Sequence, residues 1–255
     1  MEGVTDTSDM LATEDPLEIR LVHGPSHNRR QQNISVTMRT PGQDTELAAG
    51  FLFTEGIISG NTDLQDIILS DEDDGAIANV HLNPHAHARL GQSQRNFAAT
   101  AACGVCGKTG IAAIHTDVAV STGHFTFAAD KLYGLPAVLR NEQAVFDTTG
   151  GLHAAALFDA AGSLLLLRED IGRHNAVDKL IGAAMAQELT PLTNCLMLLS
   201  GRAGFELIQK AAMAGIPLIA AIGAPSSMAV KKAAQWKITL LGFLKEERFN
   251  IYSAP

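Results

Sequence analysis

The sequence has little cysteine, little basic charge and no long apolar run. Its 255 residues include three Cys, too few for a disulfide framework, which favours reduced thiols in a soluble cytoplasmic protein. Lys and Arg number 19 against 27 Asp and Glu, and the formal charge of −8 argues against a nucleic-acid partner, which usually requires a basic footprint. No apolar run reaches the roughly 20 residues of a membrane span, and the acidic residues 1–16 contain no signal or transit peptide. We therefore expect neither a membrane nor a nucleic acid as partner.

Hydrophobic residues make up 46% of the sequence, enough for a full core. The polar residues 1–16 are expected to be a disordered tail, and residues 17–99 a small α+β domain. Alternating apolar residues predict two half-buried strands there, one at Leu17, Ile19 and Leu21 and one at Ile34, Val36 and Met38.

A helix is expected to follow these strands, with Asp44 as its cap and Gly56 as its stop. Its acidic residues Glu46 and Glu55 are interpreted as solvated charges. Two further strands are predicted over 64–70 and 76–82, on either side of an acidic turn.

Residues 111–255 repeat a pattern of apolar strand, glycine-rich or polar turn, and helix. This pattern predicts a layered α/β domain with a mainly parallel sheet, because strands buried on both faces read as continuous apolar runs. Three turns, at 168–175, 200–206 and 223–227, would open at the carboxyl ends of strands, where ligands bind in such sheets.

The three turns combine backbone N–H groups at helix N-termini with arginine forks and hydroxyl groups, which together suit phosphate. The candidate ligand-binding residues are Arg173, His174, Gly201, Arg202, Ser226 and Ser227. The alternative is that the glycines only form tight turns and the serines only cap helices. Asp170, His174 and Asp178 could also transfer protons, although the outer face of a helix is the favoured place for Asp178 and Lys179.

The loop 100–110 carries Cys103 and Cys106 among small residues. Structural zinc usually requires four ligands, and a thioredoxin-like pair should open a helix of a βαβ unit, so neither fits well. Zinc deamination requires H-x-E before its cysteines, whereas His153 is followed by Ala154 and Ala155. A sulfur carrier requires only a reactive thiolate on an accessible loop. The third cysteine, Cys195, lies in an apolar strand and is expected to be inert.

Five stretches in this order resemble the formate dehydrogenase accessory protein family of the FdhD/NarQ type. They are ELAAGFLFTEGI (46–57), CGVCG (103–107), TGGLHAA (149–155), REDIGRHNAVDK (168–179) and SGRAGFE (200–206). The resemblance implies a C-terminal domain similar to the cytidine deaminase fold without its zinc site, and no bound metal. It also implies a homodimeric sulfurtransferase that accepts sulfur from a cysteine desulfurase as a persulfide. The sulfur then passes to the bis-molybdopterin guanine dinucleotide cofactor of formate dehydrogenase.

The same resemblance assigns the persulfide to Cys103 and a supporting role to Cys106. The family's cofactor-binding stretch falls on Phe249, Asn250, Ile251, Tyr252, Ser253 and Ala254. An aromatic ring of this stretch, Tyr252 or Phe249, could stack on a guanine or pterin ring. Two other functions remain open: a cofactor chaperone without sulfur relay, and a zinc-binding structural protein.

Overall fold

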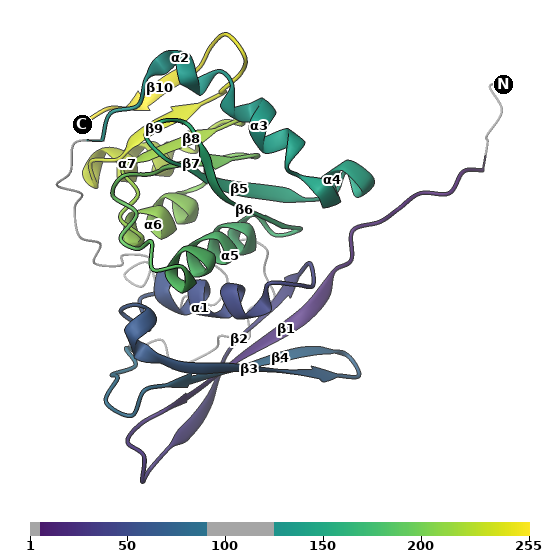
Figure 1. The fold of residues 1–255 in the computed structure, drawn as a ribbon, viewed down its shortest axis with the longest axis vertical. Coiled ribbons are helices and arrows are strands. Elements are labelled where there is room, and N and C mark those ends of the chain that lie inside the picture. The colour runs from purple at the N-terminus through teal and green to yellow at the C-terminus, as the bar shows by residue number, and fades with distance from the viewer. Residues whose placement is uncertain (1–5, 91–124) are drawn as a thin grey trace.

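A computed structural model of the chain describes residues 6–90 and 125–255, which form two sheets joined through a layer of helices (Figure 1). The smaller sheet has the strand order β2-β1-β4-β3. Its strands are β1 (Asp15–His23), β2 (Arg30–Arg39), β3 (Leu64–Glu72) and β4 (Gly75–Leu82), with a short 3-10 turn over Asn61–Asp63. Strand β1 pairs antiparallel with β2 and parallel with β4. Before β1, residues 6–14 form neither helix nor strand and extend away from the body (Figure 1).

A β-bulge in β2 changes the predicted faces of that strand. Ile19 pairs with Ser35 and Arg20 with Asn33, so Ile34 is an extra residue in the ladder. Ile34 is fully buried, whereas Val36 and Met38 are exposed on the opposite face. The expectation that all three share one half-buried face was wrong, because an inserted residue breaks the two-residue alternation.

Helix α1 (Asp44–Thr54) follows β2 and covers the inner face of the small sheet. Its N-cap is Gln43 in the left-handed conformation, and Asp44 instead accepts two hydrogen bonds from Arg39, at 3.0 and 2.9 Å. The predicted cap at Asp44 was therefore wrong, since its carboxylate is held by a buried guanidinium. Gly56 follows the helix with φ at 73°, a conformation that favours glycine at a helix end.

The larger sheet is mixed, with the strand order β10-β9-β8-β7-β5-β6. Its strands are β5 (His153–Phe158), β6 (Leu164–Asp170), β7 (Leu196–Leu199), β8 (Leu218–Ala221), β9 (Thr239–Gly242) and β10 (Asn250–Ser253). Neighbours β7, β8 and β9 are parallel, and β6 runs the same way because β5 is antiparallel to both β6 and β7. The predicted α/β class with a preceding α+β unit is confirmed, and the antiparallel strands are β5 and β10.

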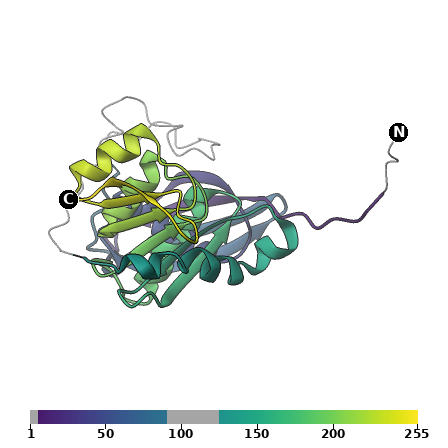
Figure 2. The ribbon, with the colours of Figure 1, turned by 90° about the horizontal axis from the view of Figure 1, so that it is seen from above.

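Helices cover both faces of the larger sheet (Figure 2). Three short helices pack on one face: α2 (Ala129–Leu132), α3 (Leu135–Asn141) and α4 (Ala144–Thr149). The other face carries α5 (Arg173–Ala186), α6 (Phe205–Met213) and α7 (Ser227–Gln235). No helix in the described parts of the chain is long and apolar enough to span a bilayer.

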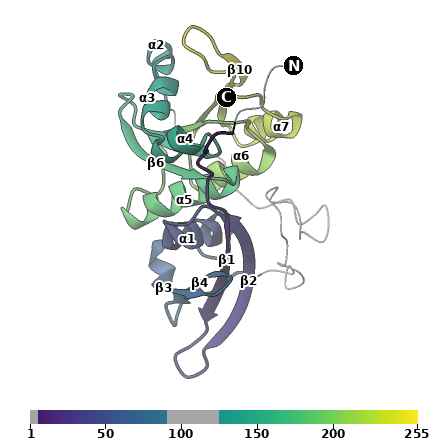
Figure 3. The same cartoon turned by 90° about the vertical axis from the view of Figure 1, so that its right-hand side faces the viewer.

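Helix α1 packs directly on α5, so the two sheets share one helical layer (Figure 3). The crossing is close because glycines face the opposite backbone. A Cβ at Gly50 would lie 1.9 Å from the Asp178 carbonyl oxygen, and a Cβ at Gly182 would lie 1.9 Å from the Glu46 carbonyl oxygen. Glu46 also forms an ion pair with Arg168, at 2.5 and 2.7 Å. Its interpretation as a solvated charge was wrong, because α1 is covered by the larger domain.

Candidate functional site

The turns that follow β6, β7 and β8 meet at one edge of the larger sheet. Backbone hydrogen bonds join two of them: the Gly223 N–H donates to the Gly201 carbonyl at 3.0 Å, and the Ser226 N–H donates to the Ala203 carbonyl at 2.9 Å. A Cβ at Gly223 would lie 2.9 Å from the Gly201 carbonyl oxygen, so this approach requires glycine. We call residues 170–174, 200–206 and 223–227 the carboxyl edge.

Arg173 and His174 open helix α5 at this edge, directly after the N-cap Gly172. His174 is buried, and its Nε2 lies 2.7 Å from a carboxylate oxygen of Glu206 in α6. His174 therefore joins the first turn to the second. Arg173 is half-buried and Arg202 is exposed, so both guanidinium groups remain within reach of a ligand.

His153, the first residue of β5, is a further edge residue that the sequence reasoning did not select. It pairs with Asp170 across β6, and its Nδ1 would lie 3.1 Å from a Cβ at Gly201. Burial lowers the pKa of His153, and the nearby Arg173 and Arg202 lower it further. Its position inside the TGGLHAA stretch was the available signal.

The cationic cluster of Arg173 and Arg202, which lies near the His153 ring, makes the carboxyl edge a candidate anion site. The two guanidinium groups offer forked donors, and the N–H groups at the start of α5 lie beside them. Such a site suits phosphate groups.

Asp170 lies behind this cluster and is fully buried. Its carboxylate pairs with the equally buried Lys179 at 2.8 Å and accepts hydrogen bonds from the N–H groups of Thr40 and Gly172 and from the Asn175 side chain. With four donors around it, Asp170 holds the start of α5 against the end of β2. The suggested proton-transfer role for Asp170 is not supported by this arrangement, because its oxygens face the protein interior.

Asp178 and Lys179 lie inside the protein, so their expected place on an outer helix face was wrong. Asp178 pairs with Lys210 of α6 at 2.9 Å and accepts a hydrogen bond of 2.7 Å from Thr54 of α1. Burial would lower the pKa of Lys210, but the carboxylates of Asp178 and Glu55 outweigh it and raise that pKa above its usual value. Glu55 lies 3.4 Å from Lys210, so it too faces a protein partner and was wrongly interpreted as solvated.

Ser226 caps helix α7, since its hydroxyl oxygen accepts a hydrogen bond of 3.2 Å from the Ala229 N–H. Ser226 and its neighbour Ser227 are both exposed. The structure thus shows the capping role for Ser226 and leaves the hydroxyl of Ser227 at the surface of the edge.

The C-terminal stretch 249–254 divides between the two faces of the larger sheet. Phe249 packs beside Tyr133, which lies between helices α2 and α3, and the two ring centroids are 5.8 Å apart. Tyr252 packs on the opposite side, and a Cβ at Gly242 would lie 2.9 Å from its ring and 2.8 Å from Pro225. Tyr252 is therefore the aromatic ring of this stretch that lies beside the carboxyl edge.

The other residues of the stretch differ in exposure. Asn250, Ile251 and Ala254 are exposed, and Ile251 has 62% of its surface accessible. Ser253 is buried, which leaves it little surface for a ligand.

The cysteine pair Cys103 and Cys106 lies outside the described residues. Cys195 is buried just before β7, and burial together with the charge of Asp159 raises the pKa of its thiol. A protonated, buried thiol is unreactive, in line with the expectation for this residue. Within residues 6–90 and 125–255, no three His, Cys, Asp or Glu side chains gather as a metal site requires.

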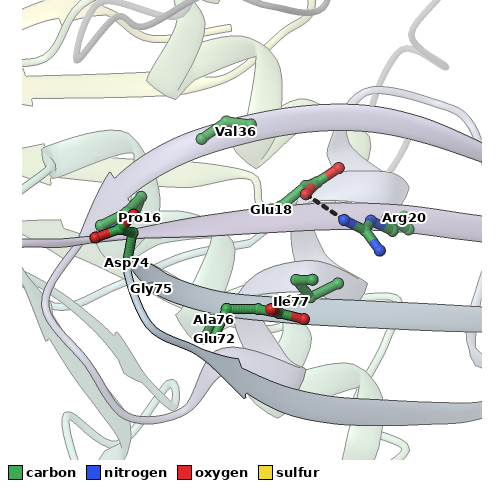
Figure 4. Close-up of a pocket in the computed structure, with 9 residues that line it drawn as sticks. All are labelled: Pro16, Glu18, Arg20, Val36, Glu72, Asp74, Gly75, Ala76 and Ile77. Atoms are coloured by element: carbon green, nitrogen blue, oxygen red, sulfur yellow. Dashed lines mark hydrogen bonds and ion pairs between the residues drawn. The ribbon is translucent and has the colours of Figure 1, made fainter.

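A hollow of about 340 Å³ lies on the outer face of the smaller sheet (Figure 4). The Glu18–Arg20 ion pair, at 2.7 Å, crosses it, and Glu72 and Asp74 add two more carboxylates. With three acidic groups against one basic group, this hollow does not suit an anion.

The fold and the carboxyl edge define a two-sheet α/β protein with a candidate anion site at one strand edge. The chain belongs to the FdhD/NarQ family, whose pattern it matches over residues 12–255. It is 48% identical to a protein of Mycolicibacterium paratuberculosis named sulfur carrier protein FdhD, over 96% of this chain and 90% of that protein. A Streptomyces coelicolor protein of the same name is 44% identical, over 98% of this chain and 89% of its own length.

A crystal structure of a formate dehydrogenase accessory protein from Desulfotalea psychrophila shows the same fold. The TM-score is 0.73 at 23% sequence identity, and the match covers 97% of this chain and 90% of that one. A guanine deaminase from Nitrosomonas europaea matches half of this chain with a TM-score of 0.37.

Proposed function

We propose that this protein is a sulfur carrier that serves formate dehydrogenase. The observation that carries the proposal is the similarity of nearly the whole chain, at 48% and 44% identity, to relatives named sulfur carrier protein FdhD. In support, the chain has two cysteines in a CGVCG loop, and its third cysteine is buried with a raised pKa.

In this proposal Cys103 carries the sulfur as a persulfide. Its thiolate attacks the outer sulfur of a persulfide on a cysteine desulfurase, a new S–S bond forms, and the donor cysteine leaves as a thiolate. Cys106 assists transfer or release by exchange. The carrier acts as a homodimer in the cytoplasm.

The acceptor in this proposal is the bis-molybdopterin guanine dinucleotide cofactor, bound as substrate before it enters formate dehydrogenase. The cationic cluster offers its phosphates two guanidinium forks, and the start of α5 offers N–H groups. Tyr252 lies beside the same edge and presents an aromatic face to a guanine or pterin ring.

The sulfur step is tested by mass spectrometry of the protein after incubation with a cysteine desulfurase and cysteine. Wild type should gain one sulfur atom, Cys106→Ala should still gain it, and Cys103→Ala should not. If Cys103→Ala accepts sulfur at Cys106 and still supports formate dehydrogenase activity, the assignment of the two cysteines is wrong.

A cofactor chaperone without sulfur relay is the second candidate, because the cationic cluster is built entirely without cysteine. Under this function a Cys103→Ala/Cys106→Ala double variant would still activate formate dehydrogenase. Metal analysis of the purified protein addresses the zinc-binding alternative, which predicts stoichiometric zinc.

A further inference from the structure

The outer face of the smaller sheet has no helix over it in the described parts of the chain, because α1 packs on the inner face (Figure 1). Two apolar side chains of β2 are exposed on this outer face, Val36 at 38% and Met38 at 42% of their surface. Val36 lies opposite Glu18 of β1, and Glu18 lies opposite Ile77 of β4, so apolar side chains stand on both sides of that carboxylate. Apolar groups rimmed by polar ones are typical of interaction surfaces.

The hollow on this face begins where β1 and β4 start (Figure 4). A Cβ at Gly75 would lie 2.7 Å from Cγ of the Pro16 ring, so no side chain fills the space at that point. Ala76 and Ile77 continue the lining along β4. The volume of about 340 Å³ lies within the range of roughly 300–1,000 Å³ that ligand pockets have, so the hollow can accept side chains inserted from a partner.

The charge around the hollow is mainly negative. Glu18 is held by Arg20 at 2.7 Å, whereas Glu72 and Asp74 are exposed and open to a partner (Figure 4). Within residues 6–90 and 125–255, the acidic side chains do not converge as a metal ion requires. Separate carboxylates of this kind suit separate cationic side chains, and the formal charge of −8 on the whole chain attracts a basic partner over a longer range.

We propose that this outer face is a docking surface for a basic segment of another protein, one that carries lysine or arginine beside aliphatic residues. The aliphatic side chains pack on Val36 in the hollow, and the cationic groups pair with Glu72 and Asp74. A second copy of this chain does not fit, because it would bring the same excess of carboxylates against the first. The helical layer of α1 and α5 separates this surface from the carboxyl edge, so the inference is independent of the proposed function (Figure 1).

Fluorescence anisotropy with two labelled peptides tests the proposal on the full chain. The peptide Lys-Val-Arg-Val-Lys should bind wild type saturably, and Glu-Val-Glu-Val-Glu should not bind. The affinity for the basic peptide should fall at least fivefold between about 50 and 500 mM NaCl, because salt screens exposed ion pairs.

Variants then separate a local site from general attraction. Glu72→Gln/Asp74→Asn should weaken binding of the basic peptide about fivefold, in keeping with the modest coupling of two exposed ion pairs. Val36→Thr keeps the shape and strand propensity of valine but should weaken binding about threefold through lost apolar contact. The matched control is Asp130→Asn/Glu142→Gln, which removes the same number of exposed carboxylates from the larger domain and should bind the peptide like wild type.

Backbone amide spectra locate the bound peptide. Signals of Ala76 and Ile77 should shift on addition of Lys-Val-Arg-Val-Lys, while those of Asp130 and Glu142 stay in place. Thermal unfolding shows whether each variant is folded, so that a loss of binding can be attributed to the surface itself.

Three results would overturn the proposal. If Glu72→Gln/Asp74→Asn and its control bind the peptide equally well, the attraction comes from net charge alone. If wild type shows no saturable binding, the face is not a docking surface for basic segments. If Glu72→Gln/Asp74→Asn changes the sedimenting mass of the protein, the face joins two copies of this chain. The persulfide measurement on Cys103 is unaffected by any of these outcomes.

Discussion

Gly50 of α1 and Gly182 of α5 mark the place where the two halves of the protein approach most closely, each with the opposite helix backbone in its missing side-chain position. The carbonyls that they approach belong to Asp178 and Glu46, which are ion-pair residues themselves. The close crossing therefore also brings Asp178 within hydrogen-bonding distance of Thr54, and Glu46 within reach of Arg168.

Replacing Gly182 with Ala should destabilise the protein by about 3 kcal/mol or more, the upper part of the range for overpacked sites, because the obstructing atoms are backbone. Urea unfolding measures the change. Gly134→Ala is the control, since its Cβ would have only one neighbour within 4 Å, at 3.9 Å, and its stability should stay close to that of wild type. Equal stability of both variants would show that α1 and α5 can separate freely.

Replacing Lys179 with Met should cost about 3–5 kcal/mol, because it leaves the Asp170 carboxylate buried with no opposite charge. The exposed Lys231→Met should change stability by less than about 0.5 kcal/mol. Chemical denaturation of both variants tests this. A loss at Lys179 no larger than that at Lys231 would contradict the assigned ion pair.

Acidification should destabilise the protein through His153 and His23. Both have a pKa below the ordinary value of 6.5, so the unfolded chain binds protons more readily than the folded chain. Their stabilising contribution is present above about pH 6.5 and is lost as the pH falls below it. Melting temperatures between pH 7.5 and 5 should fall less steeply in His153→Gln than in wild type, and least steeply when His23 is replaced as well. Parallel curves for all three proteins would count against the lowered pKa values.

Cys195 should resist alkylation in the folded protein, because its thiol is buried and its pKa is raised. In the Cys103→Ala/Cys106→Ala variant, iodoacetamide should label the native protein slowly and the urea-unfolded protein quickly. Mass spectrometry counts the label. Rapid labelling of the native variant would mean that Cys195 could itself accept sulfur, and the persulfide assay would then require a Cys195→Ala background.

Tyr252→Leu should weaken guanine-nucleotide binding about fivefold or more if Tyr252 stacks on the base, since aromatic stacking contributes about 1–3 kcal/mol per base. Phe249→Leu is the matched control, because Phe249 packs beside Tyr133 on the other face of the sheet. Calorimetry with GDP gives both affinities. Unchanged affinity in Tyr252→Leu would exclude stacking at this position.

Regular features of the fold were predictable from the sequence. Continuous apolar runs such as Leu196–Leu199 are typical of strands buried on both faces, and the turns after such strands open at one edge when the strands run in parallel. The class of the fold and the position of the carboxyl edge both follow from this pattern.

The pattern failed where a partner lies far away in the sequence. Asp178 and Lys179 look like solvated helix charges in the sequence. In the fold, α6 brings Lys210 to Asp178, and the residue after β2, Thr40, brings a carbonyl that accepts a hydrogen bond of 2.7 Å from Lys179. The bulge at Ile34 is equally invisible, because the alternation of its neighbours continues unchanged in the sequence.

His153 was missed for a related reason. The TGGLHAA stretch marks the segment but does not single out its histidine, and the relation of His153 to Arg173 and Arg202 exists only after three separate strands have paired. In contrast, Arg202 stands within a glycine-rich turn and could be selected from its immediate neighbours.

The apolar residues that join α1 and α5 belong to one continuous core, which runs from Leu17 and Ile19 of the smaller sheet through Val177 and Ile181 of α5 to Leu199 and Ile219 of the larger one. Neither sheet can lose its partner without exposing that core to water. We therefore expect the two halves to unfold in a single cooperative transition, so that secondary structure and the Trp236 signal are lost together.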